Sequence, residues 1–94
     1  MFLAVDIGNS NVTCGIFDGK NWIEIIRISS DLNFWNQFNV LQKYKVNNAA
    51  ISSVVPKLTD VYNQSINNLF HVESFIIDHN ITNTVVLCLF STKP

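Results

Sequence analysis

Three short apolar runs, joined by tight turns, open this sequence and constrain its fold more than any other feature. The runs are Phe2–Asp6, Val12–Phe17 and Trp22–Ile28. The first two flank a turn that contains Gly8, and Asp18-Gly19 separates the second from the third. Asp-Gly is typical of tight hairpins because glycine adopts the positive φ that their turns need. The sequence therefore predicts three antiparallel strands that pair in chain order.

Helical and apolar segments alternate in the next part of the chain. Aromatic and aliphatic residues recur at helical spacing over Leu32–Lys45, and an almost unbroken apolar run, Ala49–Val55, follows. Such a run is typical of a buried parallel strand, which Pro56 would end. Lys57–Phe70 again has an apolar helical face, and Ser74–Ile77 is predicted as a further strand. The predicted order is three antiparallel strands, then parallel strands joined by two helical crossovers, which are almost always right-handed.

The length and composition of the chain favour one small folded domain. Of its 94 residues, 48% are hydrophobic and 14% are charged, so we expect a packed core rather than disorder. The net charge is −1 and no basic cluster is present, which argues against nucleic acid as a partner. The apolar start Met1–Val5 is too short for a signal peptide or a membrane span, so we expect a cytoplasmic protein without membrane contact. No role is assigned to the apolar run Val85–Phe90.

Two cysteines, Cys14 and Cys88, lie far apart within apolar runs. A single disulfide between them and two buried free thiols both fit this placement, and a reducing compartment favours the thiols. The sequence contains no spacing of cysteine and histidine that is typical of a zinc site.

The first apolar run ends in a carboxylate, Asp6, which is followed by the polar stretch Gly8–Asn11. A partly buried aspartate destabilises a fold unless it meets a cation or hydrogen-bond donors. Gly8 allows a ligand to approach the backbone, and the amides and polar side chains from Gly8 to Thr13 can donate to phosphate oxygens. An acid beside such donors suits a hydrated Mg²⁺ ion that bridges nucleotide phosphates. The alternative is a plain hairpin whose Asp and Asn side chains cap their own backbone.

Two functional classes share the predicted order of elements. A ribonuclease H-like nuclease needs further carboxylates, on the first helix and after the fourth strand, to hold two metal ions. Neither the predicted helix Leu32–Lys45 nor the segment Ser52–Pro56 contains an acid. A nucleotide site of the sugar-kinase and actin type needs only the phosphate turn and its acid in this part of the fold. The sequence therefore favours the nucleotide-binding class.

Four stretches resemble the amino-terminal half of the type III pantothenate kinases. They are Val5–Asn11, Gly15–Gly19, Arg27–Ser29 and Ile51–Thr59. This family belongs to the superfamily of acetate and sugar kinases and actin. The resemblance implies an α/β fold, namely a ribonuclease H-like half domain of an actin-type ATPase that spans residues 1–94, with the carboxy-terminal domain missing.

The resemblance also implies an activity, the transfer of a phosphoryl group from ATP to pantothenate in the first step of coenzyme A biosynthesis. It implies Mg²⁺, a monovalent cation (K⁺ or NH₄⁺) and a homodimer. Carried over by position, Asp6 is the metal-linked acid and the one catalytic residue of this chain. The implied turn that binds the ATP phosphates consists of Asp6, Ile7, Gly8, Asn9, Ser10, Asn11, Val12 and Thr13.

One departure from the family pattern bears on activity. Family members carry a Gly-Ala-Asp-Arg motif further along the chain, and its aspartate is the catalytic base. This sequence reaches Lys93-Pro94 without such a motif, so we expect the 94-residue chain alone to be inactive. A non-catalytic regulatory module of the Bvg accessory factor type shares the same residues and is the alternative.

The remaining polar and aromatic candidates favour structural roles. We interpret Ser52-Ser53 as small residues of a buried strand, because no histidine base has an evident path to them. We interpret Phe34, Trp35 and Phe38 as core and interface residues rather than a base-stacking platform, which would need basic neighbours. We interpret His71 and His79 as helix-cap or loop residues, and Arg27 as a salt-bridge partner.

Overall fold

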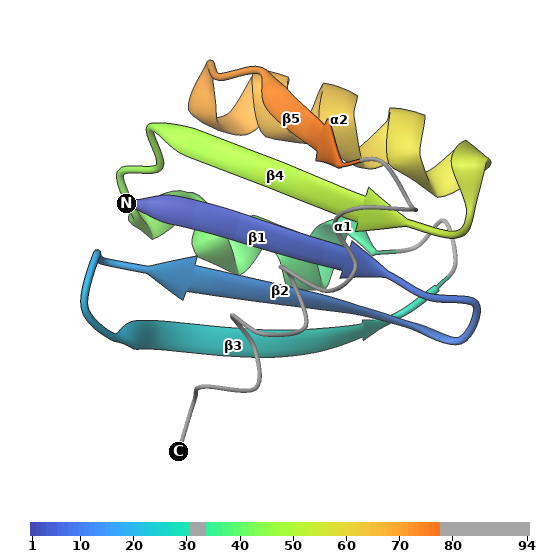
Figure 1. Cartoon of the computed structure of the whole chain (residues 1–94), viewed down its shortest axis with the longest axis horizontal. Helices are drawn as coiled ribbons and strands as arrows, with labels where there is room; N and C mark the ends of the chain where they lie inside the picture. Colours follow the sequence, from blue (N-terminus) through green and yellow to red (C-terminus); the bar gives the residue numbers. More distant parts are fainter. Residues whose placement is uncertain (31–33, 78–94) are drawn as a thin grey trace.

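The computed structural model describes residues 1–30 and 34–77, and five strands within them form one mixed sheet (Figure 1). The strands are β1 (Phe2–Ile7), β2 (Asn11–Phe17), β3 (Trp22–Ser29), β4 (Asn48–Ser53) and β5 (Ser74–Ile77). Their order across the sheet is β3-β2-β1-β4-β5. The first three pair antiparallel, β4 pairs parallel with β1, and β5 pairs parallel with β4.

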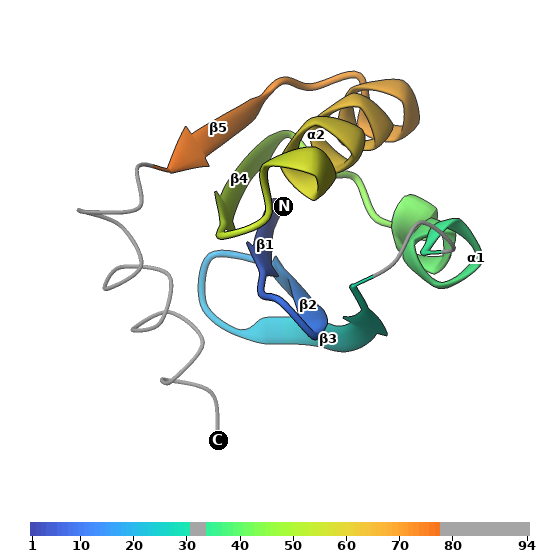
Figure 2. The same cartoon turned by 90° about the vertical axis from the view of Figure 1, so that its right-hand side faces the viewer.

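Helical segments connect the parallel strands and lie on one side of the sheet (Figure 2). They are α1 (Trp35–Phe38), a 3₁₀ segment η1 (Asn39–Lys43) and α2 (Pro56–Phe70). This arrangement confirms the predicted fold class, an α/β ribonuclease H-like half domain of the actin type. In the part of the chain that the structure describes, no helix covers the opposite side of the sheet.

The core lies between the sheet and the helices. Leu3, Val5 and Ile7 alternate along β1 and are almost completely buried, because every second side chain of a strand points to the same face. Tyr62 of α2 stacks on Phe34 with ring centroids 4.2 Å apart. Burying an aliphatic or aromatic side chain of this size contributes about 1.5–3 kcal/mol, so this layer stabilises the packing of the helices on the sheet.

The predicted helix Leu32–Lys45 is confirmed in part: residues 32 and 33 lie outside the described residues, and the helix changes type at Asn39 and ends before Tyr44. An α-helical turn of four residues passes into the 3₁₀ segment, which ends at Lys43. Phe38 and Leu41, three residues apart, are both fully buried. Three residues make one turn of a 3₁₀ helix, so the tighter winding aims both side chains at the core.

Tyr44, which was predicted to lie in that helix, has an extended backbone (φ −93°, ψ 147°). Its hydroxyl donates to the Glu24 carboxylate on β3, and Glu24 also lies 3.4 Å from the Lys43 ammonium. These contacts hold the end of η1 against β3, where the backbone of Tyr44 is extended and no longer helical.

The junction between β4 and α2 also differs from the prediction. β4 ends at Ser53 because the Ser53 hydroxyl accepts a hydrogen bond from the Val55 amide (2.9 Å) and turns the chain. Pro56 begins α2 instead of ending the strand, which suits a residue that has no N–H to leave unpaired in the first helical turn. None of the helices in the described ranges is long and apolar enough to span a membrane. The run Val85–Phe90 lies outside the described residues.

Candidate functional site

The turn between β1 and β2 is closed by its own backbone. Ile7 pairs with Val12 across the hairpin, and the Gly8 amide donates to the Asn11 carbonyl oxygen at 2.9 Å. A Cβ atom on Gly8 would lie 3.2 Å from that oxygen, which is tighter than ordinary van der Waals contact. A larger residue at this position would push the Asn11 carbonyl by a few tenths of an ångström, so the closed turn favours glycine.

Neighbouring strands brace this turn from both sides. From the end of β3, the Ser30 hydroxyl donates to the Gly8 carbonyl oxygen (2.8 Å) and the Ser30 amide to the Ser10 carbonyl oxygen (3.0 Å). From the end of β4, the Val54 amide donates to the Ile7 carbonyl oxygen (3.0 Å). The shape of the turn is thus fixed before any ligand arrives.

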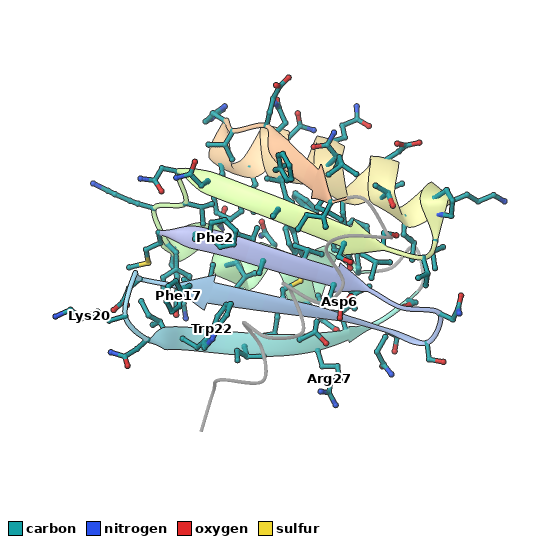
Figure 3. The ribbon with its side chains drawn as sticks, viewed as in Figure 1. Phe2, Asp6, Phe17, Lys20, Trp22 and Arg27 are labelled. Atoms are coloured by element: carbon teal, nitrogen blue, oxygen red, sulfur yellow. The ribbon has the colours of Figure 1, made fainter. Side chains whose placement is uncertain are left out.

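Asp6 lies beside the turn, on the sheet face that carries no helix in the described residues (Figure 3). It is paired in register with Thr13 of β2 and with Ser52 of β4, so the three side chains share that face. The carboxyl is half-buried, and this burial raises its pKa above the usual range. Within residues 1–30 and 34–77, no hydrogen bond or ion pair reaches the carboxylate. The ionised form of a carboxylate placed this way is stabilised when a cation binds to it.

The predicted phosphate-binding residues divide into two groups. The side chains of Asn9, Ser10 and Asn11 are exposed, and Thr13 is partly exposed next to Asp6. Ile7 and Val12 are buried in the core and offer a ligand only backbone atoms.

The expectation that all the amides from Gly8 onward face a ligand needs correction, because the Gly8 amide is already used to close the turn. Among the described residues, the amides of Asn9 and Ser10 make no hydrogen bond. Within this part of the chain, the turn therefore leaves fewer unpaired backbone donors than the sequence suggested.

Asp6 is the only carboxylate in this row of the sheet, and the described ranges contain no group of three or more His, Cys, Asp or Glu residues that could enclose a metal ion. Mg²⁺ binds readily with one or two protein carboxylates when water molecules and phosphate oxygens complete its octahedron. The residues present therefore fit a hydrated magnesium ion that is shared with a nucleotide, and they do not fit a closed protein site.

The other candidates have structural roles. Cys14 is a free thiol buried in the core, where burial raises its pKa far above the usual range and makes it inert. His71 ends α2 in the left-handed conformation (φ 59°), and its amide donates to the Asn67 carbonyl oxygen, which confirms a cap. Phe34 and Phe38 are core residues, whereas Trp35 is 42% exposed. Cys88 and His79 lie outside the described residues.

Comparison with known proteins adds a family to this geometry. A family model described as type III pantothenate kinase matches residues 2–91. The chain belongs to the type III pantothenate kinase family. The match includes β1, the turn after it, and both strand ends that brace the turn.

Individual relatives agree with the family match. A type III pantothenate kinase of Malacoplasma penetrans is 35% identical over 82 residues, which cover 80% of this chain and 32% of the relative. The corresponding protein of Ehrlichia canis is 34% identical over 92 residues, which cover 85% of this chain and 34% of the relative. The type III pantothenate kinase of Pelobacter propionicus is 35% identical over 92 residues, which cover 86% of this chain and 36% of the relative. The chain thus spans about a third of the length of these relatives.

Proposed function

We propose that this chain is the ATP-binding half of a pantothenate kinase, which transfers a phosphoryl group from ATP to pantothenate in the first step of coenzyme A biosynthesis. Membership of the family supports the reaction class. The observation that carries the proposal is the half-buried Asp6 carboxylate, which has no partner in the described residues and lies beside a braced turn whose Asn9 and Ser10 amides make no hydrogen bond to those residues.

In this proposal each group of the turn has one task. Asp6 holds Mg²⁺, directly or through a bound water molecule, and the metal ion supplies positive charge to the phosphates. The amides of Asn9 and Ser10, with the polar side chains of the turn, donate to phosphate oxygens. Because the turn is fixed by Ser30 and Val54, binding requires little ordering of the backbone.

The rest of the reaction is assigned to parts of the kinase beyond this chain. Pantothenate binding, the catalytic base, the monovalent cation site and the homodimer contacts are proposed to need the remaining two thirds of a protein as long as the relatives. The 94-residue chain is then expected to bind Mg·ATP without phosphorylating pantothenate. Measurable phosphorylation of pantothenate by this chain alone would contradict the assignment of these functions to other parts of the kinase.

Equilibrium dialysis with Mg·ATP tests the proposal. Asp6→Asn should weaken retention of Mg·ATP at least tenfold, because an amide oxygen replaces the charged metal ligand. Asp18→Asn is the matched control: Asp18 is exposed in the β2–β3 turn, and its carboxylate accepts the amides of Lys20 (2.8 Å) and Asn21 (2.7 Å). It should retain Mg·ATP as the unmodified chain does.

Two results would count against the proposal. Equal retention by the unmodified chain and by Asp6→Asn would remove Asp6 from the site. No retention by the unmodified chain would favour the non-catalytic regulatory module instead of a kinase half.

A further inference from the structure

Arg27 of β3 lies in the same transverse row of the sheet as Asp6. Asp6 pairs with Thr13, and Thr13 pairs with Arg27. Directly paired residues of neighbouring strands share a face, so all three belong to the sheet face on which the described residues place no helix. Neighbouring strands lie about 4.8 Å apart, which places the backbones of Asp6 and Arg27 roughly 10 Å from each other.

The Arg27 side chain is exposed. The ion pair found among residues 1–30 and 34–77 joins Lys43 to Glu24, so Arg27 has no ion-pair partner in those ranges. Arg27 is the only cationic side chain that the described strand register places in the row of Asp6. The lysines of the described ranges lie in the β2–β3 turn, in η1, in the loop before β4 and at the start of α2 (Lys20, Lys43, Lys45 and Lys57).

Figure 3 shows the Arg27 side chain extending past the free edge of β3, while Asp6 lies over the sheet. An exposed arginine side chain changes rotamer within nanoseconds, so this direction is one of several that it samples. Its long stem can carry the guanidinium back across Thr13 when an anion occupies the row.

We propose that Arg27 is a phosphate-binding residue that contacts the Mg·ATP polyphosphate from the β3 side, opposite the metal ion at Asp6. This rests on the proposed function, since it names a further ligand for the same site. A nucleoside triphosphate remains anionic after one Mg²⁺ ion has bound to it. A guanidinium presents a planar fork of donors that matches two phosphate oxygens, and this geometry makes arginine well suited to such a site.

The test compares Arg27→Gln with Arg27→Lys and with the control Lys20→Gln in the 94-residue chain. Lys20 is an exposed cation at the other end of the same sheet (Figure 3), so its variant makes the same change of net charge away from the row. Calorimetric titration with Mg·ATP should show about tenfold weaker binding for Arg27→Gln and a smaller loss for Arg27→Lys. Lys20→Gln should bind within about twofold of the unmodified chain because exposed distant charges are screened by salt.

The outcomes distinguish a failure of the proposed function from a failure of the role of Arg27 alone. If the unmodified chain does not bind Mg·ATP, or if Asp6→Asn binds equally well, the proposed function and the role of Arg27 both fall. If Asp6→Asn loses binding while Arg27→Gln keeps it, only the role of Arg27 is overturned. A urea unfolding curve for each variant gives the fraction of folded protein, and the affinity is calculated for that fraction. Arg27→Lys is a second comparison, because it keeps the positive charge.

Discussion

At the scale of single residues, the half-buried Asp6 carboxyl opposes folding when it is ionised. Burial raises the pKa of the Asp6 carboxyl in the folded chain above the value in the unfolded chain. The folded state therefore binds more protons in the window between the two values, and stability falls as the pH rises through it. A cation bound at the carboxylate would oppose this loss, because it favours the charged form.

Asp6→Asn should consequently stabilise the ligand-free protein at pH 7. We expect a gain of about 1 kcal/mol or less in the free energy of unfolding, and no gain below a pH of about 3, where the carboxyl is protonated in both states. Urea unfolding at the two pH values measures the difference.

Asp18 supplies a control of opposite sign for the pH experiment. Hydrogen bonds from the Asn21 and Lys20 amides lower the pKa of the Asp18 carboxyl, so its contribution is present at neutral pH and is lost as the pH falls through the lowered value. Asp18→Asn should therefore reduce stability at pH 7. A loss of stability for Asp6→Asn at pH 7 would show that the carboxylate has a stabilising partner.

At the scale of elements, the sequence predicted the structure best where the spacing of apolar residues fits only a strand or only an α-helix. Alternating apolar residues predicted the strands of the meander, and the apolar face over residues 57–70 predicted α2 almost to its ends. The spacing of Phe34, Phe38 and Leu41 fits both an α-helix and a 3₁₀ turn, so it could not predict where one gives way to the other. That choice is made by contacts with Tyr62 and with β3, which are distant in the chain.

The same limit applied to the site. The position of Asp6 at a strand end and the polar turn after it were visible in the sequence. The sequence could not predict that the Gly8 amide donates to Asn11, or that Ser30 and Val54 brace the turn. These are hydrogen bonds that no sequence pattern encodes. The row that joins Asp6 to Arg27 became visible only with the strand register, although every second residue of β1, β2 and β3 could be assigned to a face beforehand.

The aromatic contacts of α1 predict unequal roles for two neighbouring rings. Phe38 is fully buried, with its ring centroid 5.5 Å from that of Tyr62, whereas Trp35 is 42% exposed on the same short helix. Phe38→Ala should cost about 3–5 kcal/mol, because it removes buried surface and leaves a cavity. Trp35→Ala should cost less than about 1 kcal/mol. Equal losses in urea unfolding would mean that α1 is not anchored through Phe38.

At the scale of the whole molecule, the described helices cover one face of the sheet and leave an apolar edge. Among the described strands, β5 lies at the edge of the sheet, and its Phe75 and Ile76 side chains are 68% and 47% exposed. Exposed apolar residues on an unpaired strand edge favour pairing with another chain. We therefore expect the 94-residue chain to associate with itself as its concentration rises.

Phe75→Lys should reduce this association, because a charge on an edge strand opposes edge-to-edge pairing. Light scattering over a range of concentrations measures the change in mean mass. Val40→Lys is the control, since Val40 is also 47% exposed but lies on η1, away from the edge. An unmodified chain that stays monomeric at high concentration, or an equal effect of both variants, would contradict the role of this edge.

The bracing of the first turn also has a consequence for the order of events during folding. The Ser30 hydroxyl that fixes the Gly8 carbonyl oxygen comes from 22 residues further along the chain, and the Val54 amide comes from beyond β4. A nascent chain that has produced only the first hairpin cannot hold the turn in its final shape. A triphosphate that needs the final shape of the turn would then bind only to molecules in which β3 and β4 have already joined the sheet.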